Sequence, residues 1–235
     1  MNMKKLVTLL LAAAMLFSLS ACGTIQNLFG GGSGSSGPKL DDSKAENRDY
    51  TIGVDAMQAF ISDPSIDSYA TLLGGNIAAQ ELANFIRAYE DFYGQESGAY
   101  ISPLADSVRG GTISGSEDEP QDENSVGRTQ RNLDTFRANL RSGITASREQ
   151  LAQMSDKEWE SLAMQRGMSV QEMKALSETL IQSMEALLAA LEDVTVEETH
   201  VVRIDLDGAS SSSQYVTVCF ADGRWFTEAL LDTYI

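Results

Sequence analysis

The sequence predicts an α+β domain: an N-terminal helical part, then helices packed on a C-terminal antiparallel sheet. Three observations indicate this fold class. Apolar residues recur at helical spacing through most of residues 77–192. From His200 onward, apolar and polar residues alternate with the period of a strand. An Asp-Gly pair at residues 222–223 separates the last two such runs, and this pair is a strong hairpin signal.

The first part of the domain, residues 49–96, is predicted to be helical. Its clearest helix covers residues 77–93, where one stripe of apolar side chains recurs at helical spacing. Asn76 is suited to cap the start of this helix, and Gly94 is suited to end it in a left-handed turn. A weaker apolar pattern predicts a short helix over residues 54–61.

Residues 97–127 interrupt the periodic pattern and are expected to form a flexible loop. They contain several glycines and an acidic run over residues 117–123. A stretch of this length without secondary structure is unusual in a compact domain, so it is either a mobile excursion or a seam between two parts. The ordered ligand spacing and the glycine of an EF-hand are absent, which argues against a calcium loop.

The final part, residues 128–235, is predicted to combine helices with the sheet. A helix over residues 129–153 has one apolar face. Its other face carries five arginines: Arg128, Arg131, Arg137, Arg141 and Arg148. These arginines form either a solvated face with local ion pairs or a docking face for the acidic run or an anionic ligand.

Two complete helix-start signals follow the arginine-rich helix. Each is a capping box in which a serine precedes a glutamate by three positions: Ser155 with Glu158, and Ser169 with Glu172. They predict helices over residues 156–166 and 170–192, the first of which ends at Gly167. Three strands are then expected, in this order along the chain: residues 200–207, 215–220 and 224–231. The last strand is expected to continue or to bend into a short terminal turn, and the helix over 170–192 is expected to cover the meander.

The N-terminus has the pattern of a secretory signal. Lys4 and Lys5 precede an apolar run over residues 6–17, which at about 12 residues is shorter than the roughly 20 that span a bilayer. We therefore expect residues 1–21 to be a cleaved signal peptide. A Gly- and Ser-rich stretch follows, so residues 22–48 are expected to form a flexible tether.

The end of this signal, Leu19-Ser20-Ala21-Cys22, resembles the lipobox of bacterial lipoproteins. In that family the cysteine thiol receives a diacylglycerol and the preceding peptide bond is then cut. The resemblance implies lipidation of Cys22, palmitate-type acyl chains, membrane lipid as a partner, and a place on the outer face of the cell membrane. The alternative is an ordinary signal peptide that happens to place a cysteine at its end.

The chain is strongly acidic. Residues 1–21 hold two lysines and no acid, so cleavage moves the formal net charge from −17 to −19. Such a charge repels nucleic acid and anionic headgroups, which argues against both as electrostatic partners. It favours solubility, and it also suits cationic ligands or peptides.

Few residues are suited to catalysis. His200 is the one histidine and is expected to be half-buried on its strand, so an enzyme would have to use it or a buried carboxylate. Cys219 is expected to lie in the core, and with Cys22 lipidated no internal disulfide is expected. The Asp205 and Asp207 pair is expected to be solvated rather than to act on a glycan. No metal or cofactor site is expected, because zinc sites draw on three or four His or Cys ligands and no phosphate-binding loop is present.

The C-terminal third resembles nuclear transport factor two-like proteins. The resemblance covers residues 150–231, where helices precede a meander that closes on Phe220-Ala221-Asp222-Gly223-Arg224-Trp225. It implies a curved antiparallel sheet wrapped around helices, with a pocket between them. The long acidic middle and the helix-rich first half depart from that pattern, so no functional residue is carried over.

These features favour a membrane-anchored extracytoplasmic lipoprotein that acts as a non-catalytic binding or interaction module. The methionine-rich helices suit an apolar guest, so the expected partner is a small apolar ligand or another protein. Two alternatives stay open: an envelope-acting enzyme that uses His200 or a buried carboxylate, and a structural component of a surface complex.

Overall fold

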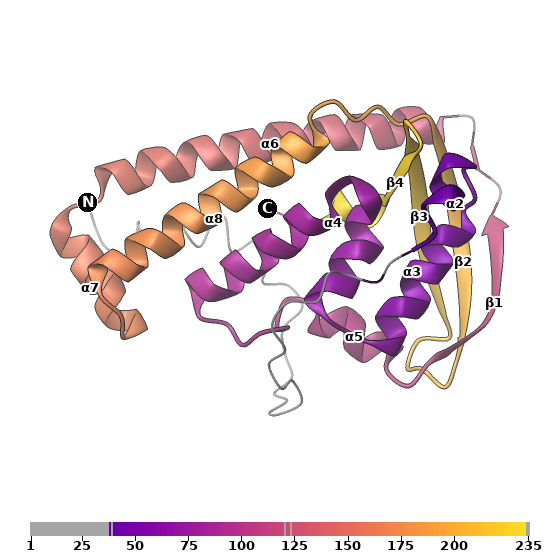
Figure 1. Cartoon of the computed structure of the whole chain (residues 1–235), viewed down its shortest axis with the longest axis horizontal. Helices are drawn as coiled ribbons and strands as arrows, with labels where there is room; N and C mark the ends of the chain where they lie inside the picture. Colours follow the sequence, from indigo (N-terminus) through magenta and orange to yellow (C-terminus); the bar gives the residue numbers. More distant parts are fainter. Residues whose placement is uncertain (1–37, 39, 120, 123, 234–235) are drawn as a thin grey trace.

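The computed structural model describes residues 38, 40–119, 121–122 and 124–233. These residues form an α+β domain, as predicted, with a sheet at one end and a helical arm that extends away from it (Figure 1). The signal peptide, the lipobox and residues 22–37 of the tether lie outside the described residues. Within the described part of the chain, no helix has both the length and the apolarity needed to cross a bilayer.

Four helices of the described chain precede its first strand: α2 (Asp42–Glu46), α3 (Thr51–Ser62), α4 (Ile66–Tyr93) and α5 (Ser102–Val108). Helix α2 lies within the predicted tether, so the folded domain begins earlier than residue 49. Helix α3 is longer than the predicted short helix, because Ile52, Met57 and Phe60 all pack in the core. Gly94 ends α4 with φ 65°, which confirms the predicted left-handed cap.

Helix α4 begins well before the predicted start at residue 77 and bends at Gly75. The sequence Gly74-Gly75 marks the bend, where Gly75 has φ 56° and ψ −139° inside the helix. A Cβ atom on Gly75 would overlap the backbone carbonyl of Trp225. Asn76, the predicted cap, instead accepts a hydrogen bond from the Trp225 N–H at 2.9 Å. The bend therefore lets α4 lie directly against the strand that contains Trp225.

The arm consists of three helices in sequence: α6 (Ser125–Gln153), α7 (Asp156–Arg166) and α8 (Val170–Leu191). Both capping boxes are present, and Gly167 ends α7 with φ 66°, so these predicted boundaries are confirmed. Helices α6 and α8 run alongside each other, and α7 lies at the end distant from the sheet (Figure 1).

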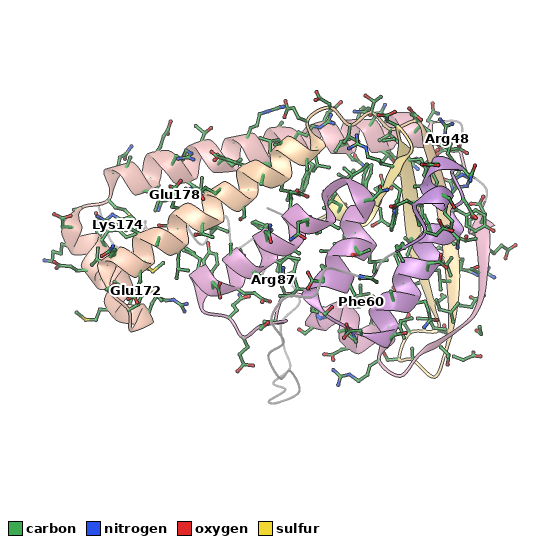
Figure 2. The ribbon with its side chains drawn as sticks, in the orientation of Figure 1. Arg48, Phe60, Arg87, Glu172, Lys174 and Glu178 are labelled. Atoms are coloured by element: carbon green, nitrogen blue, oxygen red, sulfur yellow. The ribbon has the colours of Figure 1, made fainter. Side chains whose placement is uncertain are left out.

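The tip of the arm has a small hydrophobic cluster of its own. Phe92 from α4 packs there with Met154, Trp159 and Met173. The Lys174 ammonium lies over the Trp159 ring, 5.3 Å from its centre. Figure 2 shows Lys174 on the outside of α8, along which further charged side chains point to solvent. The arm is thus stabilised by its own core and not by the sheet alone.

The sheet has four antiparallel strands in the order β1-β2-β3-β4. Their bounds are β1 (Thr112–Glu119), β2 (Glu198–Asp207), β3 (Ser213–Ala221) and β4 (Arg224–Thr227), and a 3₁₀ turn, η1 (Glu228–Leu230), follows. Asp222 and Gly223 have φ 49° and 68°, as a two-residue type I′ hairpin requires, so the predicted hairpin is confirmed. The third predicted strand ends at Thr227 and bends into the short turn.

Two expectations were wrong because of β1. The sheet has four strands instead of three, and residues 97–127 are not a flexible loop throughout. Residues 97–127 contain helix α5 and a strand that pairs with β2 from Thr112 to Glu119. Glycine, serine and acidic residues fill this strand, and these types have low strand propensity. Its structure comes from pairing with a strand more than eighty positions away, which no local pattern records.

One face of the sheet is packed against the N-terminal helices. Val202, Ile204, Val218 and Phe220 are each at most 1% exposed and belong to the main core. A Cβ atom on Gly53 of α3 would approach Val218 to 2.5 Å, so this helix lies very close to the sheet. This close packing determines where the residues next to α3 lie relative to the ends of β1 and β2.

We expect Gly75→Ala to lower the free energy of unfolding by about 2–4 kcal/mol, because the new methyl group meets the Trp225 backbone and φ is positive. Gly167→Ala is the matched control, since Gly167 also has positive φ but no atom lies within 4 Å of the position that its new Cβ would take. That control should cost about 1 kcal/mol. Urea unfolding measures both, and equal losses would contradict the close approach of α4 to β4.

Candidate functional site

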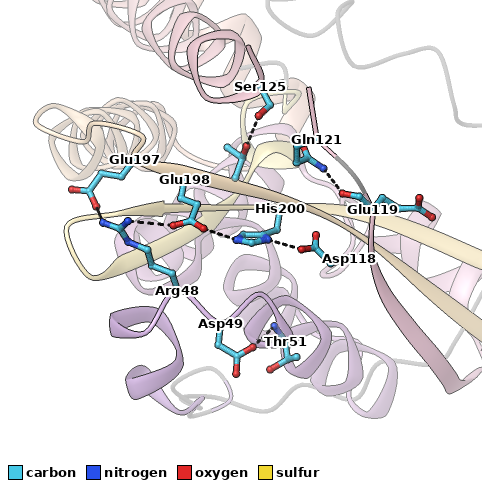
Figure 3. A network of polar contacts seen from close by, with 11 residues as sticks. Arg48, Asp49, Thr51, Asp118, Glu119, Gln121, Ser125, Glu197, Glu198 and His200 are labelled. Carbon is cyan, nitrogen blue, oxygen red and sulfur yellow. Dashed lines mark hydrogen bonds and ion pairs between the residues drawn. The ribbon is translucent and has the colours of Figure 1, made fainter. Parts of the chain in front are cut away.

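His200 lies at the centre of a polar network between the sheet and the N-terminal helices (Figure 3). Its Nδ1 is 2.9 Å from a carboxylate oxygen of Asp118 on β1. Its Nε2 is 3.0 Å from a carboxylate oxygen of Glu198, two residues earlier on β2. The side chain is 19% exposed, so the histidine is half-buried, as predicted.

Arg48 extends this network toward the start of the domain. It follows α2 and donates to Glu197 at 2.6 Å and to Glu198 at 3.2 Å. Its backbone has φ 56°, a left-handed conformation that costs a non-glycine residue about 1–2 kcal/mol. The two ion pairs offset part of that cost, and they connect the segment before α3 to β2.

Two aromatic rings enclose the histidine. The Tyr50 ring centre lies 5.7 Å from that of His200, and the Phe220 ring meets it edge-on at 6.0 Å. Carboxylates only accept hydrogen bonds from an imidazole, so both contacts form together when the ring carries both protons, and a neutral ring satisfies one of them. Through Asp118 the ring on β2 is connected to β1, whereas Glu198 lies on the same strand as the histidine.

The opposite face of the sheet has a second ionic cluster around Arg203. Its guanidinium is 3.2 Å from Glu117, 3.3 Å from Glu119 and 3.3 Å from Asp205. Asp205, which was expected to be solvated, is therefore partly neutralised by an arginine, whereas Asp207 is exposed at the strand end. Neither carboxylate has the environment of a general acid.

The arginines of α6 bind mostly to α8 and its C-terminal end. Arg128 does pair with the upstream acidic run, at 2.9 Å from Asp122. Arg148 pairs with Glu185 on α8 at 2.8 Å, and Arg141 pairs with Glu192 just after α8. The interpretation as a face with local ion pairs therefore describes Arg128, Arg141 and Arg148.

Arg137 departs from the predicted solvated face, because it is only 8% exposed. Its Nε donates to the Leu191 carbonyl at 2.8 Å, and its Nη2 donates to the carbonyls of Leu191 and Val194. The Leu191 carbonyl is at the end of α8 and the Val194 carbonyl lies just beyond it, where a cation also interacts favourably with the helix dipole. Sequence periodicity places Arg137 one position from Phe136, and that is the only signal that it points inward.

Cys219 is buried at 0% exposure, as expected for a core residue. Removal from water raises the pKa of its thiol well above the usual value, and the nearby charge of Glu228 acts in the same direction. The reactive form of cysteine is the thiolate, so Cys219 is not suited to nucleophilic chemistry in the folded state.

Glu90 is a buried carboxylate that the sequence did not single out. It is 3% exposed on α4 and accepts hydrogen bonds from the backbone N–H groups of Gly98 at 3.1 Å and Tyr100 at 2.9 Å. Burial raises the pKa of Glu90, and the two hydrogen bonds oppose that effect. Its role in the fold is to fix the turn between α4 and α5.

Two of the hollows on the described surface have linings that do not include His200. One, of about 230 Å³, lies beside the bend in α4 and is bordered by Asp42, Asp67, Asn76 and Trp225. The other is a shallow groove of about 470 Å³ between α6 and α8, with Ile144 and Leu188 at its base. An apolar pocket between the 156–192 helices and the sheet, which would favour ligand binding, is not one of these two.

Fold and site together define an α+β domain whose central polar network is built from ion pairs. No group of three or more His, Cys, Asp or Glu side chains among the described residues is arranged to hold a metal ion. Comparison of the chain with protein-family models, with curated proteins and with solved structures found no match. The resemblances to lipoproteins and to nuclear transport factor two-like proteins stay predictions.

We expect His200→Ala to lower the free energy of unfolding by about 1 kcal/mol, because the contact of His200 with Asp118 between β1 and β2 is lost together with its contact with Glu198 on β2 itself. Amide exchange should quicken mainly in β1, which has no other strand neighbour in the described sheet. Exchange measured by NMR tests this, and a uniform increase across the whole sheet would contradict a local connecting role.

Stability should fall with rising pH through the contribution of Glu90. The raised pKa means that the folded state holds this proton more tightly than the unfolded chain does. The contribution is therefore fully present below the ordinary glutamate pKa and is lost as pH rises through the higher pKa of the folded state. In Glu90→Gln this slope should disappear, so its stability relative to the native protein improves as pH rises above the ordinary glutamate pKa. Urea unfolding at a series of pH values measures the difference, and parallel curves would show that Glu90 does not titrate abnormally.

Proposed function

We propose that this chain is an extracytoplasmic lipoprotein, anchored through lipid on Cys22 to the outer face of the cell membrane, and that its folded domain is a non-catalytic interaction module. The anchor is supported by the two lysines, the short apolar run and the lipobox-like Leu19-Ser20-Ala21-Cys22. Two acyl chains on one cysteine are sufficient for stable anchoring.

The observation that carries the interaction role is the structural use of both residues best suited to catalysis. Both ring nitrogens of His200 contact carboxylates, and Cys219 is buried with a raised thiol pKa. A Ser-His or Cys-His enzyme needs a nucleophile within hydrogen-bond reach of its base. The described contacts of His200 are with Asp118 and Glu198 instead.

The shape of the domain supports the same role. The sheet and the arm lie at opposite ends of an elongated body, which gives a large surface for its volume (Figure 1). Residues 23–37 contain six glycines and no charged residue, a composition typical of flexible linkers. A tethered, elongated and acidic domain is suited to contact partners at a distance from the membrane.

Metabolic labelling with palmitate tests the anchor. The native chain and a Cys219→Ala control should both incorporate label and fractionate with membranes, whereas Cys22→Ser should do neither. The control separates loss of the acceptor thiol from loss of any thiol, since these are the two cysteines of the sequence. Mass spectrometry that finds an unmodified Cys22, or a leader cut at another bond, would refute lipidation.

Extraction in mild detergent followed by cross-linking tests the interaction role. A specific partner should be recovered with the native chain. Recovery of the chain alone, together with a turnover that His200→Ala or Glu90→Gln abolishes, would favour an envelope enzyme instead.

A further inference from the structure

The two edge strands of the sheet, β4 and β1, differ in whether a helix covers them. At the β4 edge, the bend of α4 brings Asn76 to the Trp225 N–H, and the hydroxyl of Thr227 donates to the Leu72 carbonyl at 3.1 Å. Helix α4 thus covers this edge and satisfies the outward N–H of Trp225. A strand edge that is closed in this way cannot pair with another chain.

The β1 edge is open. Among the described residues, β1 pairs with β2 and makes no backbone hydrogen bond to any other element. Five of its eight residues are exposed. Figure 1 shows β1 as the outermost strand, with no helix beyond it. This edge therefore retains free backbone donors and acceptors that can bind a further strand.

The alternation of an antiparallel ladder determines which of these groups face outward. Successive residues of β2 direct their N–H and C=O groups alternately to β1 and to β3. The N–H of Leu206 donates to the Ser212 carbonyl, which lies on the β3 side, at 2.9 Å. Even-numbered residues of β2 therefore bond to β3, and odd-numbered residues bond to β1.

The register then identifies the outward groups of β1. Glu117 is opposite Arg203, an odd-numbered residue, and so takes part in the ladder with β2. Ser116 and Asp118 are opposite even-numbered residues, so their N–H and C=O groups point away from the sheet. Both lie beyond the irregularity between Ile113 and Gly115, in the regular part of the strand.

This part of β1 is held in place before any partner arrives. Asp118 contacts His200, and Glu117 and Glu119 contact Arg203. The Gln121 amide also donates to the Glu119 carbonyl at 3.0 Å. A strand that is already ordered loses little conformational entropy when another strand adds to it.

The charge of the edge selects the occupant. Glu117, Glu119 and the adjacent Asp205 share one arginine, Arg203, and Asp118 contacts His200, so four carboxylates meet one arginine and one histidine and the edge keeps a negative charge. A second copy would bring the same acids against each other, which disfavours pairing between copies. Residues 23–37 of the same chain contain no lysine or arginine and offer no complementary charge. An extended segment rich in lysine or arginine from another protein fits.

We propose that β1 binds such a basic segment as a fifth strand, through the outward backbone groups of Ser116 and Asp118. This inference rests on the proposed interaction role and assigns it a surface and a class of partner. Main-chain hydrogen bonds join the added strand to β1, and the acidic side chains of β1 restrict binding to cationic sequences.

The probe is a fluorescent peptide of about ten residues. Lysine occupies every second position, and valine and threonine share the positions between the lysines. A second peptide with proline in place of each threonine has the same charge but fewer backbone donors. Anisotropy with the full-length protein in detergent should show binding of the first peptide at least about tenfold tighter than of the second. Exchange of the Ser116 and Asp118 amides should slow in the complex.

Ser116→Pro is the sharpest variant, because its N–H points outward and no ladder bond to β2 is lost. It should weaken peptide binding about tenfold. The triple variant Glu117→Gln, Asp118→Asn and Glu119→Gln should also weaken binding. Its control changes the same number of charges at exposed positions on other elements: Glu149→Gln, Glu160→Gln and Asp193→Asn. That control should bind within about twofold of the native protein.

Equal binding of both peptides, or binding unchanged by Ser116→Pro in a variant with native circular dichroism, would overturn the strand-addition proposal and indicate non-specific attraction to an acidic protein. Recovery of the same cross-linked partner with Ser116→Pro as with the native chain would likewise reject this edge while leaving the interaction role intact. Loss of the partner with Ser116→Pro but not with the remote triple variant would support the proposal.

Discussion

The close contact between Gly75 on α4 and the Trp225 backbone on β4 determines how the helices and the sheet are arranged. The positive φ of Gly75 and its missing Cβ allow the helix to bend where it meets the strand. Before the bend, α4 closes the β4 edge; after it, α4 leads away and packs on α8 to begin the arm (Figure 1). This backbone contact therefore determines that α4 covers the β4 edge and where α4 turns away from the sheet toward the arm.

The arm is joined to the rest of the domain by arginines that bind the ends of helices. Arg137 donates to the last carbonyls of α8, where the chain turns toward β2. Arg166 of α7 donates to the Asp91 and Tyr93 carbonyls at the end of α4, both at 2.9 Å. Each arginine satisfies acceptors that a helix cannot satisfy by itself. The two contacts fix α6 against α8 and α7 against α4, which gives a polyanionic chain specific structural uses for some of its few cations.

Features encoded over a few neighbouring residues were predictable from the sequence, and features that depend on distant partners were not. The capping boxes, the glycine that ends α7 and the Asp-Gly hairpin are local, and each lies where predicted. The β1 strand and the bend at Gly75 depend on β2 and β4, and Arg137 depends on the end of α8. His200 was identified because it is the one histidine of the sequence. Its contact with Asp118 could not be predicted, because Asp118 lies on β1, a strand that the sequence pattern does not indicate.

The same acids explain both why β1 was missed and what it can do. Acidic and glycine residues weaken a strand on its own, so its pairing with β2 is supported by the contacts of its acids with Arg203 and His200 on the neighbouring strand. Arg203 neutralises only part of the edge, and the remaining negative charge repels a second copy of the chain. A sheet with one edge covered by a helix and the other left open but acidic is protected from self-association at both edges. Within the described residues the acidic edge is not covered by a helix, so protection by charge, unlike protection by a helix, leaves its backbone groups available to a cationic strand.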